Sequence, residues 1–244
     1  MRIITFFLLA CVSILSWSQE SGTHSGSDYP LLNFEISSHQ LSSAFSAFIY
    51  FEGGDKHLRN INQALTNTEA QLQALTIKNA GLEKAWADAK AHVERYEGHV
   101  FNGFDMSLEG GWSLVQNAMQ AEILALKQTN PVSDEAKQGQ IYLLLSFRLS
   151  LEELLAQYMS IANSTTGGYG VSRGELSIED RVAMTEDLLQ KLKSSGANVD
   201  AINRKWQYIK KTILAYNSNI APFVVIHTVD TIRKQSARLI ADAD

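Results

Sequence analysis

The chain has 244 residues, a net charge of −5 and a single cysteine, Cys11. Its charges are mildly acidic and interspersed, whereas nucleic-acid binding requires a basic surface, so we expect no nucleic-acid partner. A lone cysteine excludes an internal disulfide and a cluster of thiolate metal ligands, so the fold must be held together by its apolar core.

The first residues have the pattern of a secretory signal. One arginine precedes an apolar run that extends from Ile3 to Trp17, and small residues flank Trp17 in front of a cleavage site after Ser18. We therefore predict a signal peptide over residues 1–18. The polar residues 19–30 predict a flexible leader.

Localisation follows from this leader in one of two ways. A signal peptide on a chain without a mature cysteine is typical of a periplasmic or secreted protein of the bacterial envelope, because secreted eukaryotic domains are commonly disulfide-bonded. The stretch Leu8–Cys11 also matches a lipobox, which would instead give a lipoprotein anchored at Cys11. The apolar run continues past Cys11, and this favours plain cleavage.

After the leader, apolar residues recur in alternating steps of three and four, which is the spacing of one helix face. The run from Val199 to Ile220 keeps this spacing without a polar break. The predicted helices cover residues 31–52, 55–77, 80–99, 105–128, 134–163, 176–194, 198–217 and 221–242. They predict an all-α, up-down helical bundle. No later segment is apolar enough for a membrane span in the mature chain.

The two halves of the chain also align with each other. A shift of 120 residues places Trp86 on Trp206, with a shared lysine and a shared tyrosine at the same spacing. The same shift places Leu72 on Leu192. We therefore predict a duplication into two tandem four-helix units, residues 31–128 and 134–242, in which the two tryptophans are equivalent core residues. A single elongated array is the alternative.

Each half has a polar-apolar first helix, a looser second helix and a third helix with the pattern Leu/Ile-x3-Trp-x3-Lys. In this order the chain resembles the periplasmic sensing domain of type IV pili methyl-accepting chemotaxis transducers, which is similar to that of nitrate/nitrite sensor kinases. The resemblance implies a ligand-sensing bundle. In the nitrate sensors an arginine of the first helix binds the anion across a dimer, and among residues 38–42 and 146–150 only Arg148 has a guanidinium.

Glu122 and Arg148 are the candidate ligand-binding residues, because each interrupts an apolar helix face. A buried charge needs a partner, since its desolvation otherwise costs several kcal/mol. If Arg148 pairs with Glu122, the role of both is structural; Glu152 and Glu153 are the other acids that we consider as partners. If Arg148 faces a cavity without an acid, an anionic ligand is favoured.

His92 and His99 are the candidate metal ligands, because they share a helix face near Glu94 and Glu97. No His-x3-His or Glu-x-x-His pair accompanies them, so the interpretation as two ordinary histidines is favoured and no metal or cofactor is predicted. Neither a Gly-x-Ser-x-Gly nor a His-Glu-x-x-His motif occurs, and no catalytic residue is predicted.

The function that we expect is a non-enzymatic, sensor-like or scaffold module of the periplasm. It would bind a protein partner in the cell envelope or a small ligand, and homodimer formation is also considered. The alternatives are a haem or metal carrier of the bundle type and, ranked lower, an envelope hydrolase.

Overall fold

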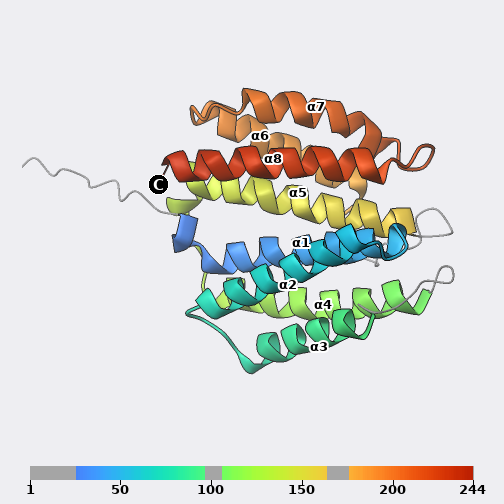
Figure 1. Ribbon diagram of the computed structural model, residues 1–244. Coiled ribbons are helices and arrows are strands. Elements are labelled where there is room, and N and C mark those ends of the chain that lie inside the picture. Colours follow the sequence, from blue (N-terminus) through green and yellow to red (C-terminus); the bar gives the residue numbers. More distant parts are fainter. Residues whose placement is uncertain (1–25, 97–105, 164–175, 244) are drawn as a thin grey trace, which may run out of the picture.

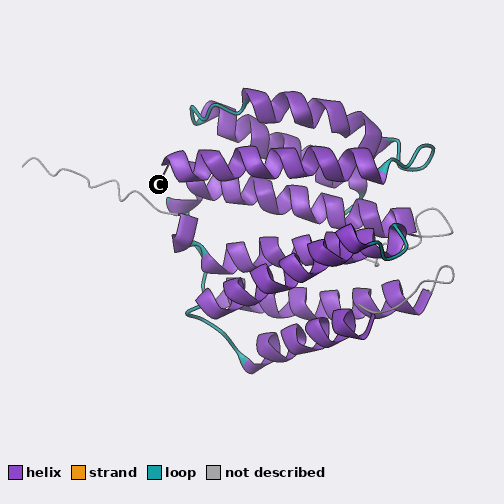
Figure 2. Ribbon diagram, viewed as in Figure 1, coloured by secondary structure: helices purple, strands orange, loops and turns teal. Residues whose placement is uncertain are grey.

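The computed structural model describes residues 26–96, 106–163 and 176–243. Within these ranges every regular element is a helix, so the all-α prediction is confirmed (Figure 2). The elements are η1 (Gly26–Asp28), α1 (Pro30–Tyr50), α2 (Asp55–Ala74), α3 (Ala80–Tyr96), α4 (Met106–Thr129), η2 (Ala136–Gln138), α5 (Gln140–Asn163), α6 (Ile178–Ser194), α7 (Asp200–Leu214) and α8 (Pro222–Ala243). None of these helices combines the length and the apolar character that a membrane crossing requires.

The predicted signal peptide, with Cys11, lies outside the described residues. The predicted leader over residues 19–30 differs from the structure at its end. Residues 26–28 form a turn of 3-10 helix, Tyr29 is buried edge-on against the ring of Tyr142, and α1 already begins at Pro30. Proline is favoured in this first helical turn, where its missing N–H is not needed.

Helices α1 and α5 lie side by side in the middle of the molecule (Figure 1). Both are buried on most of their circumference, and this explains why their sequences are apolar on several faces. The outer helices instead bury one face. In α7, for example, Ile202, Trp206 and Ile209 are buried while the intervening residues are mostly exposed.

Two apolar cores lie on either side of this central pair. One is made of residues from α1, α2, α3 and α4, and the other is centred on α5, α6, α7 and α8. Three helix pairs correspond in the two halves: α1 contacts α2 and α4 as α5 contacts α6 and α8, and α3 contacts α4 as α7 contacts α8. Residues Leu32, Ile36 and Ala47 of α1 belong to the second core. The duplication itself stays a prediction. The corresponding helix pairs show which helices of the two halves to align when it is tested.

Similar contacts in the two halves are separated by more than one shift along the sequence. Trp86 and Trp206 are both buried and keep the predicted shift of 120 residues. Buried Thr68 and Thr185, on α2 and α6, each form a hydrogen bond with a residue of the central pair, and they are 117 residues apart. With this shift Leu72 would correspond to Leu189, whereas the predicted shift of 120 residues places it on Leu192. Both leucines are buried, so this part of the alignment stays a prediction.

Candidate functional site

The structure does not join the two candidate ligand-binding residues. Glu122 lies on α4 and accepts a hydrogen bond from Asn79 Nδ2 at 3.1 Å, directly beside Gly81. A side chain at Gly81 would collide with the carboxylate of Glu122. No hydrogen bond or ion pair connects Glu122 with Arg148 in the described part of the chain, so the proposed structural pairing of these two residues is not found.

Arg148 has a largely buried guanidinium whose Nε has no hydrogen-bond partner among the described residues. Burial lowers its pKa, the charge of Glu152 raises it, and the charge of Arg233 lowers it further. Arg148 therefore lies close to an acid, but that acid is bound by other residues. Glu152 is fully buried, and Arg233 of α8 donates to both of its oxygens, from Nε to Oε1 and from Nη2 to Oε2, at 2.5 Å each.

Of the candidate metal ligands, His99 lies outside the described residues. His92 is buried beside the rings of Phe45 and Trp112, and its Nε2 lies 3.2 Å from the carbonyl oxygen of Leu108. Burial lowers the pKa of its imidazole and so favours the neutral form. This environment is that of a core histidine with a backbone hydrogen bond, and among the described residues His92 belongs to no group of three side chains that could bind a metal.

A different set of polar residues meets where α1 and α5 pack together. We call it the central polar layer, and it is held by two contacts between the helices. Gln40 Nε2 of α1 donates to Glu152 Oε1 of α5 at 3.0 Å, and His39 Nε2 lies 3.8 Å from Glu153 Oε1. The layer consists of Glu35, His39, Gln40, Arg148, Glu152 and Glu153, with Gln120, Lys127, Arg181 and Arg233 from α4, α6 and α8.

Within this layer, Glu35, His39 and Glu153 bring three metal-binding side chains together. One ligand atom from each lies within 4.8 Å of the other two. Burial raises the pKa of Glu35, although the ammonium of Lys127 pairs with this carboxylate and opposes the rise. Burial lowers the pKa of His39 to about 3, so its imidazole is neutral at physiological pH.

Sequence reasoning missed this cluster, although part of its signal was present. Glu35 and His39 are four residues apart and therefore lie on one face of α1, one turn from each other. This pair has the spacing Glu-x3-His, which matches neither the Glu-x-x-His nor the His-x3-His pattern of helical metal sites. Glu153 was considered only as a partner of Arg148, because nothing in the sequence reveals that it faces α1.

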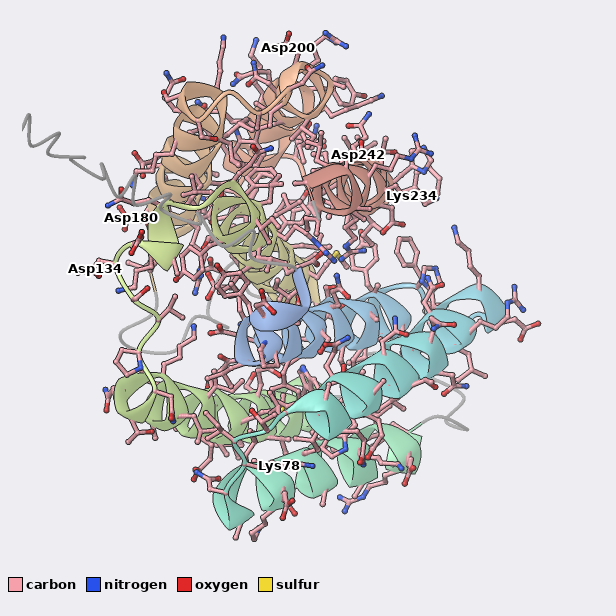
Figure 3. The ribbon with its side chains drawn as sticks, turned by 90° about the vertical axis from the view of Figure 1, so that its left-hand side faces the viewer. Lys78, Asp134, Asp180, Asp200, Lys234 and Asp242 are labelled. Atoms are coloured by element: carbon pink, nitrogen blue, oxygen red, sulfur yellow. The ribbon has the colours of Figure 1, made fainter. Side chains whose placement is uncertain are left out.

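A cavity of about 460 Å³ lies at the end of the molecule where α1 begins. Figure 3 views this end and shows the connector that carries Asp134 running from α4 towards α5. Most of the lining is apolar, with two lysines. The lining residues come from both halves and include Leu31, Leu32, Leu75, Ile77, Val132, Tyr142 and Leu149, together with Lys127 and Lys137.

The cavity and the central polar layer share Lys127, whose ammonium pairs with Glu35 while its side chain also lines the cavity. The cavity can enclose an apolar molecule, and its lysines can attract a negative group. The layer offers carboxylates and a neutral imidazole, which can bind a cation or hold the halves in register. Comparisons of the chain with protein-family models, curated proteins and solved structures give no match, so the function has to be argued from this geometry alone.

Proposed function

We propose that this protein is a non-enzymatic, sensor-like helical module of the bacterial envelope that binds a small amphiphilic acid in the cavity between its two halves. The cavity carries the proposal. Concave, mostly apolar sites with a few polar groups are the usual form of a small-molecule site. A volume of about 460 Å³ is within the range that such sites span.

The lining supports a ligand with an apolar body and one negative group. Leu31, Leu75 and Leu149 provide apolar surface, and Lys137 lies at the connector with its ammonium 2.9 Å from Asp134 Oδ1. Asp134 is almost fully exposed, so this ion pair contributes little and can exchange for a carboxylate of the ligand.

The arrangement supports binding more than catalysis. A general acid or base must reach the reacting group, yet the carboxylates of the central polar layer face cations of the protein itself. Glu152 faces Arg233, and Glu153 Oε2 accepts from Arg181 Nη1 at 2.7 Å. Neither acid lines the cavity.

The position of the cavity supports the proposed sensor-like role. Its lining includes the start of α1, the residues directly after α2 and the end of α4 from the first half, and η2 and the first part of α5 from the second half. A ligand that contacts both halves stabilises the arrangement that it fits best, and this is the physical basis of a ligand-driven shift in conformation.

The test is a titration of the full chain with cis-parinaric acid, a fluorescent fatty acid. We expect saturable binding of one molecule per chain. Leu149→Trp should abolish it by filling the cavity, while Leu188→Trp, a half-buried leucine of α6 outside the cavity, should leave it unchanged. Circular dichroism checks that both variants fold. Equal binding by the wild type and Leu149→Trp would place the fatty acid elsewhere and reject the cavity as its site.

The charge of the ligand can be tested separately. Lys137→Met should weaken binding of the acid by about two- to five-fold, the range expected for an exposed ion pair. It should not change binding of the corresponding fatty alcohol. Lys78→Met, which removes an exposed lysine outside the cavity lining, is the matched control.

A further inference from the structure

The central polar layer contains a three-residue arrangement that the proposed function does not use. Glu35 and His39 lie one turn apart on α1, and Glu153 faces them from α5. The arrangement therefore spans the two halves of the molecule. Imidazole and carboxylate together are common ligands of zinc and of other divalent transition ions.

His39 is the residue that points to a ligand. Its side chain is 12 % exposed, and its Nε2 is buried without a hydrogen-bond partner in the described part of the chain, although the side chain of Gln120 interacts with the imidazole. A buried polar atom without a partner costs free energy, so such an atom needs an explanation. The nearest acid oxygen, Glu153 Oε1, is 3.8 Å away, which is too far for a hydrogen bond but suitable for two ligands of one ion.

The two cations that pair with Glu153 and Glu35 are compatible with binding of a metal ion between the three residues. Arg181 donates to Glu153 Oε2, and this leaves Oε1 on the side of His39. In the same way, hydrogen bonds from a neighbouring residue commonly orient a carboxylate that binds a metal. Lys127 occupies Glu35, but its side chain is 38 % exposed and its four-carbon chain can turn outward.

We propose that Glu35, His39 and Glu153 bind one divalent transition-metal ion, with Zn²⁺ as the test ion, at the contact between α1 and α5. The ion takes the place of the Lys127 ammonium beside Glu35. Three protein ligands leave at least one position for water. Because the ligands come from both halves, the ion links α1 to α5.

Competition between Lys127 and the ion provides the sharpest test. We would titrate the full chain, without an affinity tag and with Cys11→Ser to remove its thiol, with Zn²⁺ in competition with a chromophoric chelator. One ion should bind per chain. His39→Ala should weaken binding by about 100-fold or more, since loss of an outer-shell partner alone costs 10- to 100-fold. Lys127→Met should tighten binding, because it removes the competing cation. His227→Asn, at an exposed histidine outside the layer, is the matched control and should change nothing.

Co²⁺ gives a second readout that does not depend on stability. Its visible absorption bands should appear on binding to the wild type and be lost in His39→Ala and Glu153→Gln, with circular dichroism confirming that both variants fold. Equal Zn²⁺ affinity of the wild type and His39→Ala overturns the proposal, and so does weaker binding by Lys127→Met. Failure of the fatty-acid titration leaves this result unaffected, because Glu35, His39 and Glu153 do not line the cavity.

Discussion

Helices α1 and α5 carry similar apolar residues but different polar residues at positions that correspond between the two halves. A shift of 113 residues superimposes Phe34 on Phe147 and Leu41 on Leu154, and all four side chains are fully buried. The same shift places Glu35 on Arg148. The carboxylate of Glu35 has Lys127 as its partner, whereas Arg148 Nε has none in the described chain. The apolar positions of the two halves thus agree, and the polar ones differ.

The contacts across the centre show the same difference. Under this shift the pair Gln40–Glu152 corresponds to the pair Glu153–His39. Glu152 is neutralised by Arg233, while neutral His39 has Gln120 as its neighbour in the equivalent place. One side of the layer is therefore the buried ion pair of Glu152 and Arg233. The other side is the neutral imidazole of His39 beside two acids, Glu35 and Glu153, each of which pairs with a cation. This teaches that apolar packing can be kept in both halves while the polar groups change their role.

The largest expected effect concerns the apolar part of the comparison. Trp86→Ala and Trp206→Ala should each lower the free energy of unfolding by about 3–5 kcal/mol, because both indoles are almost fully buried. Urea denaturation followed by circular dichroism measures this. If one substitution costs less than about 1 kcal/mol, the two tryptophans are not equivalent and the duplication loses its best support.

The next effect tests the charged side of the layer. Glu152→Gln should lower the free energy of unfolding by about 3 kcal/mol, because it leaves the buried guanidinium of Arg233 without one of its two acids. His39→Gln, on the other side of the layer, removes no charge at neutral pH and should cost less in the same urea experiment. A larger loss in His39→Gln would reverse the comparison.

The pH dependence of stability distinguishes the two sides again. Burial lowers the pKa of His39 from 6.5 to about 3, so the unfolded chain takes up a proton below pH 6.5 that the folded protein does not. The folded protein must therefore lose stability as the pH falls below 6.5. Between pH 7.5 and 5.0 this amounts to about 2 kcal/mol, at about 1.4 kcal/mol per pH unit.

Urea denaturation at several pH values, for the wild type and for His39→Gln, isolates this contribution as the difference between the two curves. We expect the variant to be less sensitive to acid over this interval. Parallel curves would mean that His39 titrates in the folded protein near its ordinary pKa.

The smallest effect is expected at Arg148. Arg148→Met should raise the free energy of unfolding by about 1 kcal/mol, because replacing a poorly paired buried charge with an apolar side chain of similar length is often stabilising. Glu35→Met, at the equivalent position, removes the carboxylate that pairs with Lys127 and should not share this gain. Thermal unfolding of both variants is sufficient, and a destabilised Arg148→Met would show that its guanidinium makes a favourable interaction.

The helices were accessible from the sequence, because each needs only its own apolar spacing. The predicted range 55–77 became α2 (Asp55–Ala74), and 198–217 became α7 (Asp200–Leu214). The alignment of the halves was accessible only where a rare residue marks it, as Trp86 and Trp206 do. Elsewhere loops of different length change the shift, and a leucine such as Leu72 fits Leu189 and Leu192 equally well by sequence.

The candidate site could not be derived in the same way, because it depends on contacts between distant residues. Glu153 meets His39 only when α1 packs against α5, and no local pattern specifies that contact. Arg148 and Glu122 stood out as charges on apolar faces, and this signal identified Arg148 as buried. It could not identify the partners, because Arg233 reaches Glu152 from the far end of the chain.

Helix α1 contributes residues to both apolar cores, and this has a consequence for folding during synthesis. Leu32, Ile36 and Ala47 need α5 and its neighbours to cover them, but α5 begins about a hundred residues later in the chain. At a synthesis rate of about 5–20 residues per second, this apolar surface stays exposed for roughly ten seconds before α5 has been synthesised. During that interval the nascent first half exposes the apolar face of α1. A chaperone that binds exposed apolar helices could bind this face until α5 covers it.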